Sequence, residues 1–222
     1  MSNDLPLVYA NQLRKSFGNK IVLRDLHFEL HEGTTAVLFG KNGVGKSVFL
    51  NCILGFLQAD QGEVRIDGHP LTDRIHIRNT SAFISSDHQD FLNLFTPREY
   101  FSFVQEIYQL PKEEATALIQ QWSDDLQVSR EMDSLFSGLS FGTKKKIQLI
   151  GALLFRPKLL VCDEIFEGLD SDAVNYVIAV FDRRQREGQS SLFTTHIAQY
   201  AMKTTSKRYV LEDGQIRDFD WG

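Results

Sequence analysis

The chain has 222 residues, and its 24 Lys and Arg against 29 Asp and Glu give a formal net charge of −5. Domains hold about 100 to 200 residues, so we expect a single domain over 1–222 with room for an insertion. The acidic balance excludes a nonspecific nucleic-acid coat, and we expect no nucleic-acid partner. A membrane span needs about 20 apolar residues, and the longest apolar run, 147–155, is shorter.

The N-terminal residues lack the basic start and the apolar run of a secretory signal, so we expect a cytoplasmic protein. The two cysteines, Cys52 and Cys162, lie far apart within apolar runs. This placement favours reduced, buried thiols over a disulfide or a metal site.

The first forty residues predict strands. Apolar and polar residues alternate at 7–10 and over 21–30, with turn signals between and after them, which indicates antiparallel strands. The continuous apolar run 35–39 predicts a central strand buried on both faces. A helix over 46–56 is expected after the loop that follows.

The middle of the chain, about 87–140, predicts a helical insertion after a short strand at 80–85. Thr96, Pro97 and Glu99 mark a helix start, because threonine and glutamate side chains satisfy free backbone N–H groups and proline suits the first turn. Aromatic residues are concentrated in this segment: Phe91, Phe95, Tyr100, Phe101, Phe103 and Tyr108.

Helices and strands alternate after the insertion. We expect helices over 142–155 and 172–186, and strands over 159–162, 191–194 and 207–211. This alternation predicts an α/β fold with a mostly parallel sheet and helices on its faces.

Residues 40–47, GKNGVGKS, match the phosphate-loop pattern GxxxxGK(S/T) between an expected strand and an expected helix. Glycines let such a loop approach phosphates, and the helix start directs its N–H groups at them. Lys46 would reach the terminal phosphates and Ser47 would bind Mg²⁺; the alternative is a glycine-rich turn with a chance Lys-Ser pair. The predicted phosphate-binding residues are Gly40, Asn42, Gly43, Val44, Gly45, Lys46, Ser47 and Val48.

The strand expected at 159–162 ends in two acids, Asp163 and Glu164. Next to a phosphate loop, Asp163 can hold Mg²⁺, and Glu164 can orient and deprotonate an attacking water. Without such a loop, the same pair would be an ordinary solvated strand end.

The segment LSFGT, residues 139–143, precedes this acidic strand. From about residue 7 to residue 216, the chain resembles the nucleotide-binding domain of ABC ATPases, whose LSGGQ-like signature has this place. Ser140 and Gly142 match the signature, whereas Phe141 stands for its first Gly and Thr143 for its Gln. The resemblance implies a P-loop NTPase core with an N-terminal antiparallel β subdomain, and it implies ATP and Mg²⁺ as ligands.

The same resemblance assigns further residues. Asp170 matches the D-loop, and His196, at the end of an expected strand, matches the switch histidine that contacts the γ-phosphate. Phe17 lies where the family places an aromatic ring that stacks on adenine, with core packing as the alternative.

Two further positions depart from the family pattern. Ser86 stands where the family usually has Gln, and Gln89 would replace it only if the loop is remodelled, so this position is left unassigned. Ile165 stands where the family usually has Pro.

Lysines 144–146 begin a helix, where they predict a solvated charged face or an added positive potential at a γ-phosphate bound by a second copy of the chain.

The resemblance implies an ATPase whose two copies associate head to tail around ATP, with Glu164, Lys46 and His196 as catalytic residues. Because the chain has no span of its own, transport requires a separate transmembrane permease subunit, and this chain would lie at the cell membrane only through that partner. The aromatic-rich insertion would receive the partner, or would form its own small core. The segment 96–101 is similar to that of short export-type ABC ATPases.

Other classes of protein stay open from the residues alone. A soluble non-transport ABC ATPase acting on ribosomes or DNA usually has tandem domains or coiled coils, which this chain lacks. An unrelated P-loop kinase or GTPase would lack the signature. A weakly active, binding-only relative is suggested by the departures at Ser86, Phe141 and Ile165.

Overall fold

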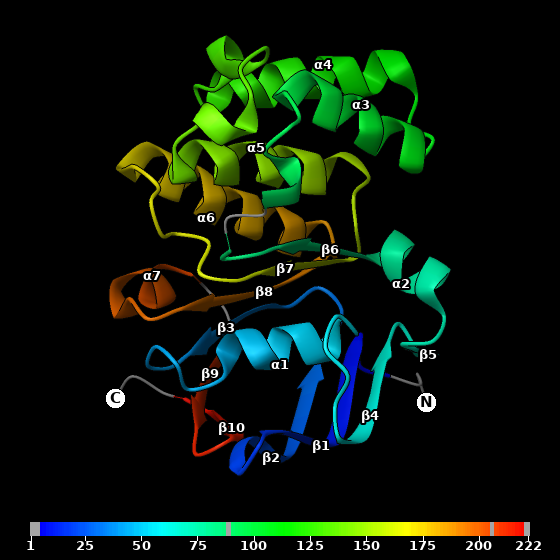
Figure 1. Ribbon diagram of the computed structural model, residues 1–222, viewed down its shortest axis with the longest axis vertical. Helices are drawn as coiled ribbons and strands as arrows, with labels where there is room; N and C mark the ends of the chain where they lie inside the picture. The colour runs from blue at the N-terminus through cyan, green and yellow to red at the C-terminus, as the bar shows by residue number, and fades with distance from the viewer. Residues whose placement is uncertain (1–4, 88–89, 205–206, 220–222) are drawn as a thin grey trace.

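The structure, a computed structural model, describes residues 5–87, 90–204 and 207–219. Helix α1 (Lys46–Ile53) lies between two sheets, and a group of helices covers the other face of the larger sheet (Figure 1). The α/β fold predicted from the alternation of strands and helices is therefore confirmed.

The smaller sheet is antiparallel, as predicted. Its first strand pairs with the second from Val8 opposite Leu30, and with the third strand of the sheet from Val8 opposite Ile66. The strand that contains Ile66 has only two buried residues, too few for a clear alternation. In order across the sheet, the strands are β2 (Lys20–Leu30), β1 (Val8–Phe17), β4 (Gln61–Ile66) and β5 (His69–Pro70).

The larger sheet is parallel except for one edge strand, formed by residues 215–218 near the end of the chain. The apolar run 35–39 forms a central strand with neighbours on both sides, as predicted. The carboxyl ends of the parallel strands meet at one edge, where the loops that carry polar side chains begin. In order, the strands are β10 (Gln215–Asp218), β9 (Lys207–Glu212), β3 (Thr35–Phe39), β8 (Ser190–Thr195), β7 (Leu159–Cys162) and β6 (Ser81–Ile84).

The helices follow the prediction at their starts more closely than at their ends. The helix expected over 46–56 ends at Ile53, because Gly55 adopts a left-handed φ of 72° that stops it. Thr96 and Glu99 form the predicted reciprocal cap. The other helices are α2 (Arg74–Thr80), α3 (Pro97–Ile107), α4 (Lys112–Asp125), α5 (Phe141–Leu154), α6 (Ser171–Arg186) and α7 (Ala198–Lys203), with 3-10 turns η1 (Asp90–Leu92), η2 (Ser129–Glu131) and η3 (Phe136–Gly138).

Two apolar clusters hold these layers together. One joins α1 to both sheets through Phe49, which packs edge-on against Phe28. The other joins α3, α4, α5 and α6 to the larger sheet, with α5 beneath α3 and α4 (Figure 1). Cys52 and Cys162 are free and buried in these clusters, which confirms their predicted packing role.

Candidate active site

The loop between β3 and α1 has the shape that the phosphate-loop pattern predicts. Gly43 and Gly45 have φ values of 76° and 118°, which side chains rarely adopt, and a Cβ on Gly45 would lie 2.7 Å from Cγ1 of Val22. Helix α1 begins directly after this loop, so its free N–H groups face the mouth of the loop. The backbone therefore forms an anion-binding cradle.

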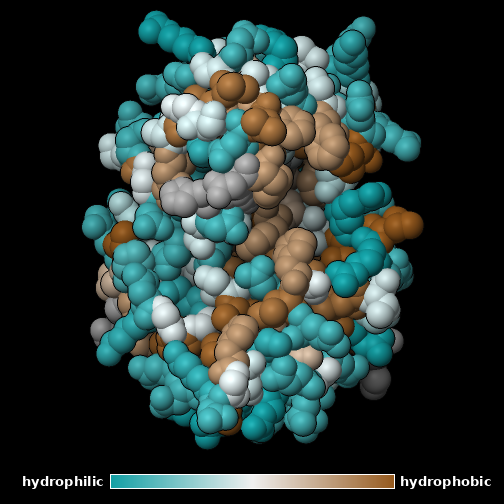
Figure 2. All heavy atoms as spheres, in the orientation of Figure 1, coloured by the Kyte–Doolittle hydropathy of each residue, from teal (hydrophilic) through white to brown (hydrophobic). Residues whose placement is uncertain are grey.

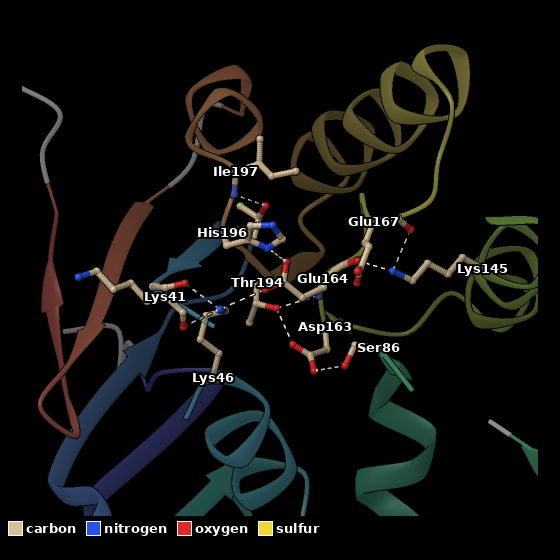
Figure 3. Close-up of polar contacts among 12 residues, drawn as sticks. Lys41, Lys46, Ser86, Lys145, Asp163, Glu164, Glu167, Thr194, His196 and Ile197 are labelled. Carbon is tan, nitrogen blue, oxygen red and sulfur yellow. Dashed lines mark hydrogen bonds and ion pairs between the residues drawn. The ribbon is translucent and has the colours of Figure 1, made fainter. Parts of the chain in front are cut away.

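Lys46 lies in the centre of this cradle. Its side chain is only 5% exposed, and Nζ donates to the carbonyl oxygens of Gly40 at 2.8 Å and Lys41 at 3.3 Å. The same ammonium lies 3.1 Å from Oε1 of Glu164. Two loop carbonyls and one carboxylate thus hold the cation in place (Figure 3).

Asp163, the first residue after β7, is 1% exposed and is held by hydroxyl groups. Oδ1 accepts a hydrogen bond from Thr194 at 2.6 Å, and Oδ2 accepts one from Ser86 at 2.7 Å (Figure 3). Within the described part of the chain, the ion pairs do not include Asp163. Ser86, which holds this buried carboxylate, and the exposed Ser47 border the same hollow, and carboxylate and hydroxyl oxygens are the hard ligands that suit Mg²⁺.

Glu164 lies at the centre of the polar contacts. Its backbone φ is 47°, and its N–H donates to Oγ1 of Thr194 at 2.8 Å. Its carboxylate lies between Lys46 and Nδ1 of His196, which is 3.0 Å from Oε2. Residues from three separate loops therefore meet at one carboxylate, at the carboxyl edge of the larger sheet.

The phosphate loop and Glu164 border a hollow of about 570 Å³. Phe17, which is half-exposed, lines this hollow, and the ammonium of Lys15 lies 5.5 Å from its ring centroid. Gly40 is buried beneath the loop and Val44 packs against the core. Other predicted site residues that line the hollow are Asn42, Gly43, Gly45, Lys46, Ser47, Val48 and His196.

The predicted site residues Ser140, Gly142 and Asp170 belong neither to the phosphate loop nor to the acidic strand end, and they do not line this hollow. Ser140 caps α5 by accepting the N–H of Thr143 at 3.2 Å, and it is exposed. Asp170 caps α6 and pairs with Lys146 at 2.6 Å, and this hydrogen bond lowers the pKa of Asp170. One chain therefore presents two separate groups of predicted site residues.

The structure corrects the prediction for lysines 144–146. Of the two interpretations given above, the solvated face is wrong for Lys145, which is 2% exposed and donates to the carbonyls of Glu164 and Glu167. Burial lowers the pKa of Lys145 from 10.5 to about 8. Helical spacing does not single out Lys145, because Lys144 and Lys146 also precede buried residues, Gln148 and Ile150, by one turn.

Ser86, which the sequence left unassigned, contributes its hydroxyl group to Asp163, and its companion Thr194 bridges Asp163 to the N–H of Glu164. Nothing in the local sequence marks these two hydroxyls, because their partner Asp163 follows a different strand, β7. Gln89, the alternative to Ser86, lies outside the described residues.

The sequence pattern of one family, described as ABC transporter, matches residues 23–167. This chain belongs to the ABC transporter family. Nod factor export ATP-binding protein I of Bradyrhizobium diazoefficiens is 28% identical over 202 residues, which cover 91% of this chain and 66% of that protein. Glutamine transport ATP-binding protein GlnQ of Geobacillus stearothermophilus is 24% identical over 215 residues, or 95% of this chain and 88% of the relative.

Solved structures agree with this membership of the ABC transporter family. An ATP binding subunit of an ABC transporter superposes with a TM-score of 0.85 at 25% identity, covering 96% of this chain and 90% of that one. This chain spans about two thirds of the length of the Bradyrhizobium relative. None of the helices in the described segments has the length and apolarity to cross a membrane.

Gly142 offers a test of the contact between α5 and the loop after β7. A Cβ at this position would lie 2.2 Å from the carbonyl oxygen of Gly168, so one of the two backbones must move. We expect Gly142→Ala to lower the free energy of unfolding by about 1–3 kcal/mol, as overpacking does. Chemical denaturation measures it. Gly138→Ala is the matched control, since its Cβ would meet nothing within 4 Å, and equal losses would contradict the prediction.

The lowered pKa of Lys145 predicts how stability varies with pH. Between pH 8 and 10.5 the unfolded chain binds this proton more strongly than the folded chain does, so stability rises with pH. Below pH 8 both states carry the charge, and the burial penalty is complete. We expect the free energy of unfolding of the wild type, relative to that of Lys145→Met, to rise by up to about 1.4 kcal/mol per pH unit between pH 8 and pH 10.5. Denaturation curves measure the difference, and a pH-independent difference would contradict the prediction.

Proposed function

We propose that this chain is the ATP-hydrolysing subunit of an ABC transporter, and that it drives transport through a separate transmembrane permease. The observation that carries the proposal is the carboxylate of Glu164, in contact with both Lys46 and His196 beside a phosphate-loop cradle. Membership of the ABC transporter family supports the same function. The chain would act in the cytoplasm, at the membrane through its permease.

In this proposal the loop residues 40–48 bind the phosphates of ATP, with backbone N–H groups and the ammonium of Lys46 facing them. The ring of Phe17, half-exposed at the edge of the same hollow, stacks on adenine. Ser47 and Asp163 would hold Mg²⁺, which neutralises charge on the phosphate oxygens when it is bound.

Glu164 would orient the attacking water and accept its proton. A carboxylate is suited to this role when its position is fixed, and here the backbone N–H and both carboxylate oxygens have partners. His196, 3.0 Å from Oε2, would hold the carboxylate and contact the γ-phosphate. Lys46 would stabilise the negative charge that develops on the transferred phosphoryl group.

The second group of predicted site residues would serve another copy of the chain. Ser140, Gly142 and Asp170 lie at the starts of α5 and α6, away from the lining of the phosphate hollow. Helix starts favour anions, so the start of α5 would face the γ-phosphate bound by a second copy arranged head to tail. ATP would then close the homodimer, and hydrolysis would release it.

The permease would dock on an apolar groove of about 580 Å³ beside the helical segment. Phe91, Phe103 and Phe56 are at least half-exposed along its lining, whereas Phe101 is buried in the core beneath. Figure 2 shows apolar side chains gathered between the upper helices and α1. The aromatic-rich segment therefore contributes rings to the core and also presents rings to the groove proposed for the permease.

We expect Glu164→Gln to keep ATP binding and to lower ATP hydrolysis by at least about 100-fold, because the amide cannot accept the proton. Since the γ-phosphate then stays in place, a dimer should accumulate with ATP. Turnover assays and light scattering measure the two effects. Glu63→Gln, the same change on exposed β4, serves as the control. Full turnover by Glu164→Gln would refute this role, and absence of hydrolysis by the wild type would favour the binding-only relative.

We expect Phe103→Asp to weaken binding of the permease, because it places a charge in the proposed groove, while ATP hydrolysis by the isolated chain is kept. Ile75→Asp is the matched control, since Ile75 is 68% exposed but does not line the groove. A photo-crosslinker in place of Phe91, on the same groove, is introduced into both variants, and detection of a crosslinked polytopic membrane protein measures docking. Equal capture by both variants would contradict the proposed surface.

A further inference from the structure

The start of α5 is fastened to the turn that follows Glu164. The ring of Phe141 packs so closely on this turn that a Cβ on Gly168 would lie 2.9 Å from its Cδ1. The ammonium of Lys145 donates to the carbonyl of Glu164 and, at 3.2 Å, to the carbonyl of Glu167 (Figure 3). Two side chains of α5 therefore contact one short turn.

Lys145 is held without a carboxylate partner. It is 2% exposed, and it joins none of the ion pairs between residues that the structure describes. The ammonium of Lys145 has three N–H donors, and two carbonyl oxygens accept hydrogen bonds from it. Its nitrogen also lies 4.4 Å from the ring centroid of Phe141. The buried cation therefore binds backbone carbonyls directly, whereas the negative charges of Glu167 and Glu164 act on it only at longer range.

The backbone that it fixes needs support. A left-handed φ at a residue other than glycine costs about 1–3 kcal/mol and persists only when neighbours hold it. Glu164 has such a φ of 47°, with Thr194 holding its N–H and Lys145 its carbonyl. The direction of the Glu164 side chain, toward Lys46 and His196, depends on this backbone conformation.

We infer that Lys145 is a positioning residue for ATP hydrolysis: it is kept in place by Phe141 and fixes the turn 164–168, so that the Glu164 carboxylate faces the phosphate loop. The inference rests on the proposed function. Because Ser140 begins the same helix, the contact also ties the surface proposed for the second copy to the catalytic carboxylate of its own chain.

The test compares purified Lys145→Met with wild type in ATP hydrolysis. We expect kcat to fall by about tenfold or more, as misplacement of a catalytic group does, while KM for ATP stays within about twofold. Each kcat is divided by the fraction of molecules that bind a fluorescent ATP analogue, so unfolded protein does not count. A kcat within twofold of wild type would overturn the inference.

Arg184→Met is the matched control. Arg184 is also a 2% exposed cation that donates to backbone carbonyls, those of Pro157 and Ser190, but it lies at the opposite end of β7 and β8. If Lys145 served stability alone, kcat per ATP-binding molecule would stay near the wild-type value in both variants; that result, or an equal loss in both, would overturn the inference. We expect kcat per ATP-binding molecule to fall only in Lys145→Met and to stay at the wild-type value in Arg184→Met.

Phe141→Leu provides a second test of the positioning role of Lys145 if Lys145→Met does not fold. It keeps the ammonium group and removes the ring face, so we expect kcat to fall by about threefold with unchanged KM, in line with the weaker cation–π contact. An unchanged kcat in Phe141→Leu would overturn the inference.

Hydrogen exchange separates this inference from the proposed function. The Glu167 amide donates to the Glu164 carbonyl at 3.1 Å, so its protection reports on the turn. We expect faster exchange over 164–168 in Lys145→Met and Phe141→Leu, and wild-type exchange there in Arg184→Met. Equal exchange in all proteins would overturn the inference. Lack of hydrolysis by the wild type would instead overturn the proposed function.

Discussion

The carboxylate of Glu164, held between Lys46 and His196, is the interaction on which the site depends. Each partner comes from a different loop at the carboxyl edge of the sheet. The three side chains therefore meet only when β3, β7 and β8 pair in the observed register. The packing of the sheet thereby sets the positions of the charged groups of Glu164 and Lys46 relative to each other and to His196.

Buried cations in this acidic chain are satisfied mainly by backbone carbonyls. Lys46, Lys145 and Arg184 each donate to at least two of them. Such partners have fixed positions, whereas acidic side chains can turn away, so each cation fixes the course of a loop. A buried cation without such partners would cost several kcal/mol, so each loop is stabilised in the conformation that offers its carbonyls.

Prediction from sequence succeeded where the signal is local. The run 35–39 and the Thr96 cap define their elements through neighbours in the chain, and both were confirmed. Strand β4 and helix α4 carry weak signals, because few of their residues are buried and the pattern is short or broken. Lys145 was misjudged because helix starts disfavour cations, and only the turn after Glu164 supplies the carbonyls that reverse this preference.

The sequence by itself determined the family, the phosphate loop and the acidic strand end, because their residues are adjacent in the chain and their chemistry is set by spacing. Only the tertiary structure decided that Ser86 and Thr194 hold Asp163, that Lys145 holds the backbone of Glu164, and that the predicted site residues divide into two groups. Each of these contacts joins segments at least 19 residues apart. Their partners are chosen by the order of strands in the sheet, which no local pattern encodes.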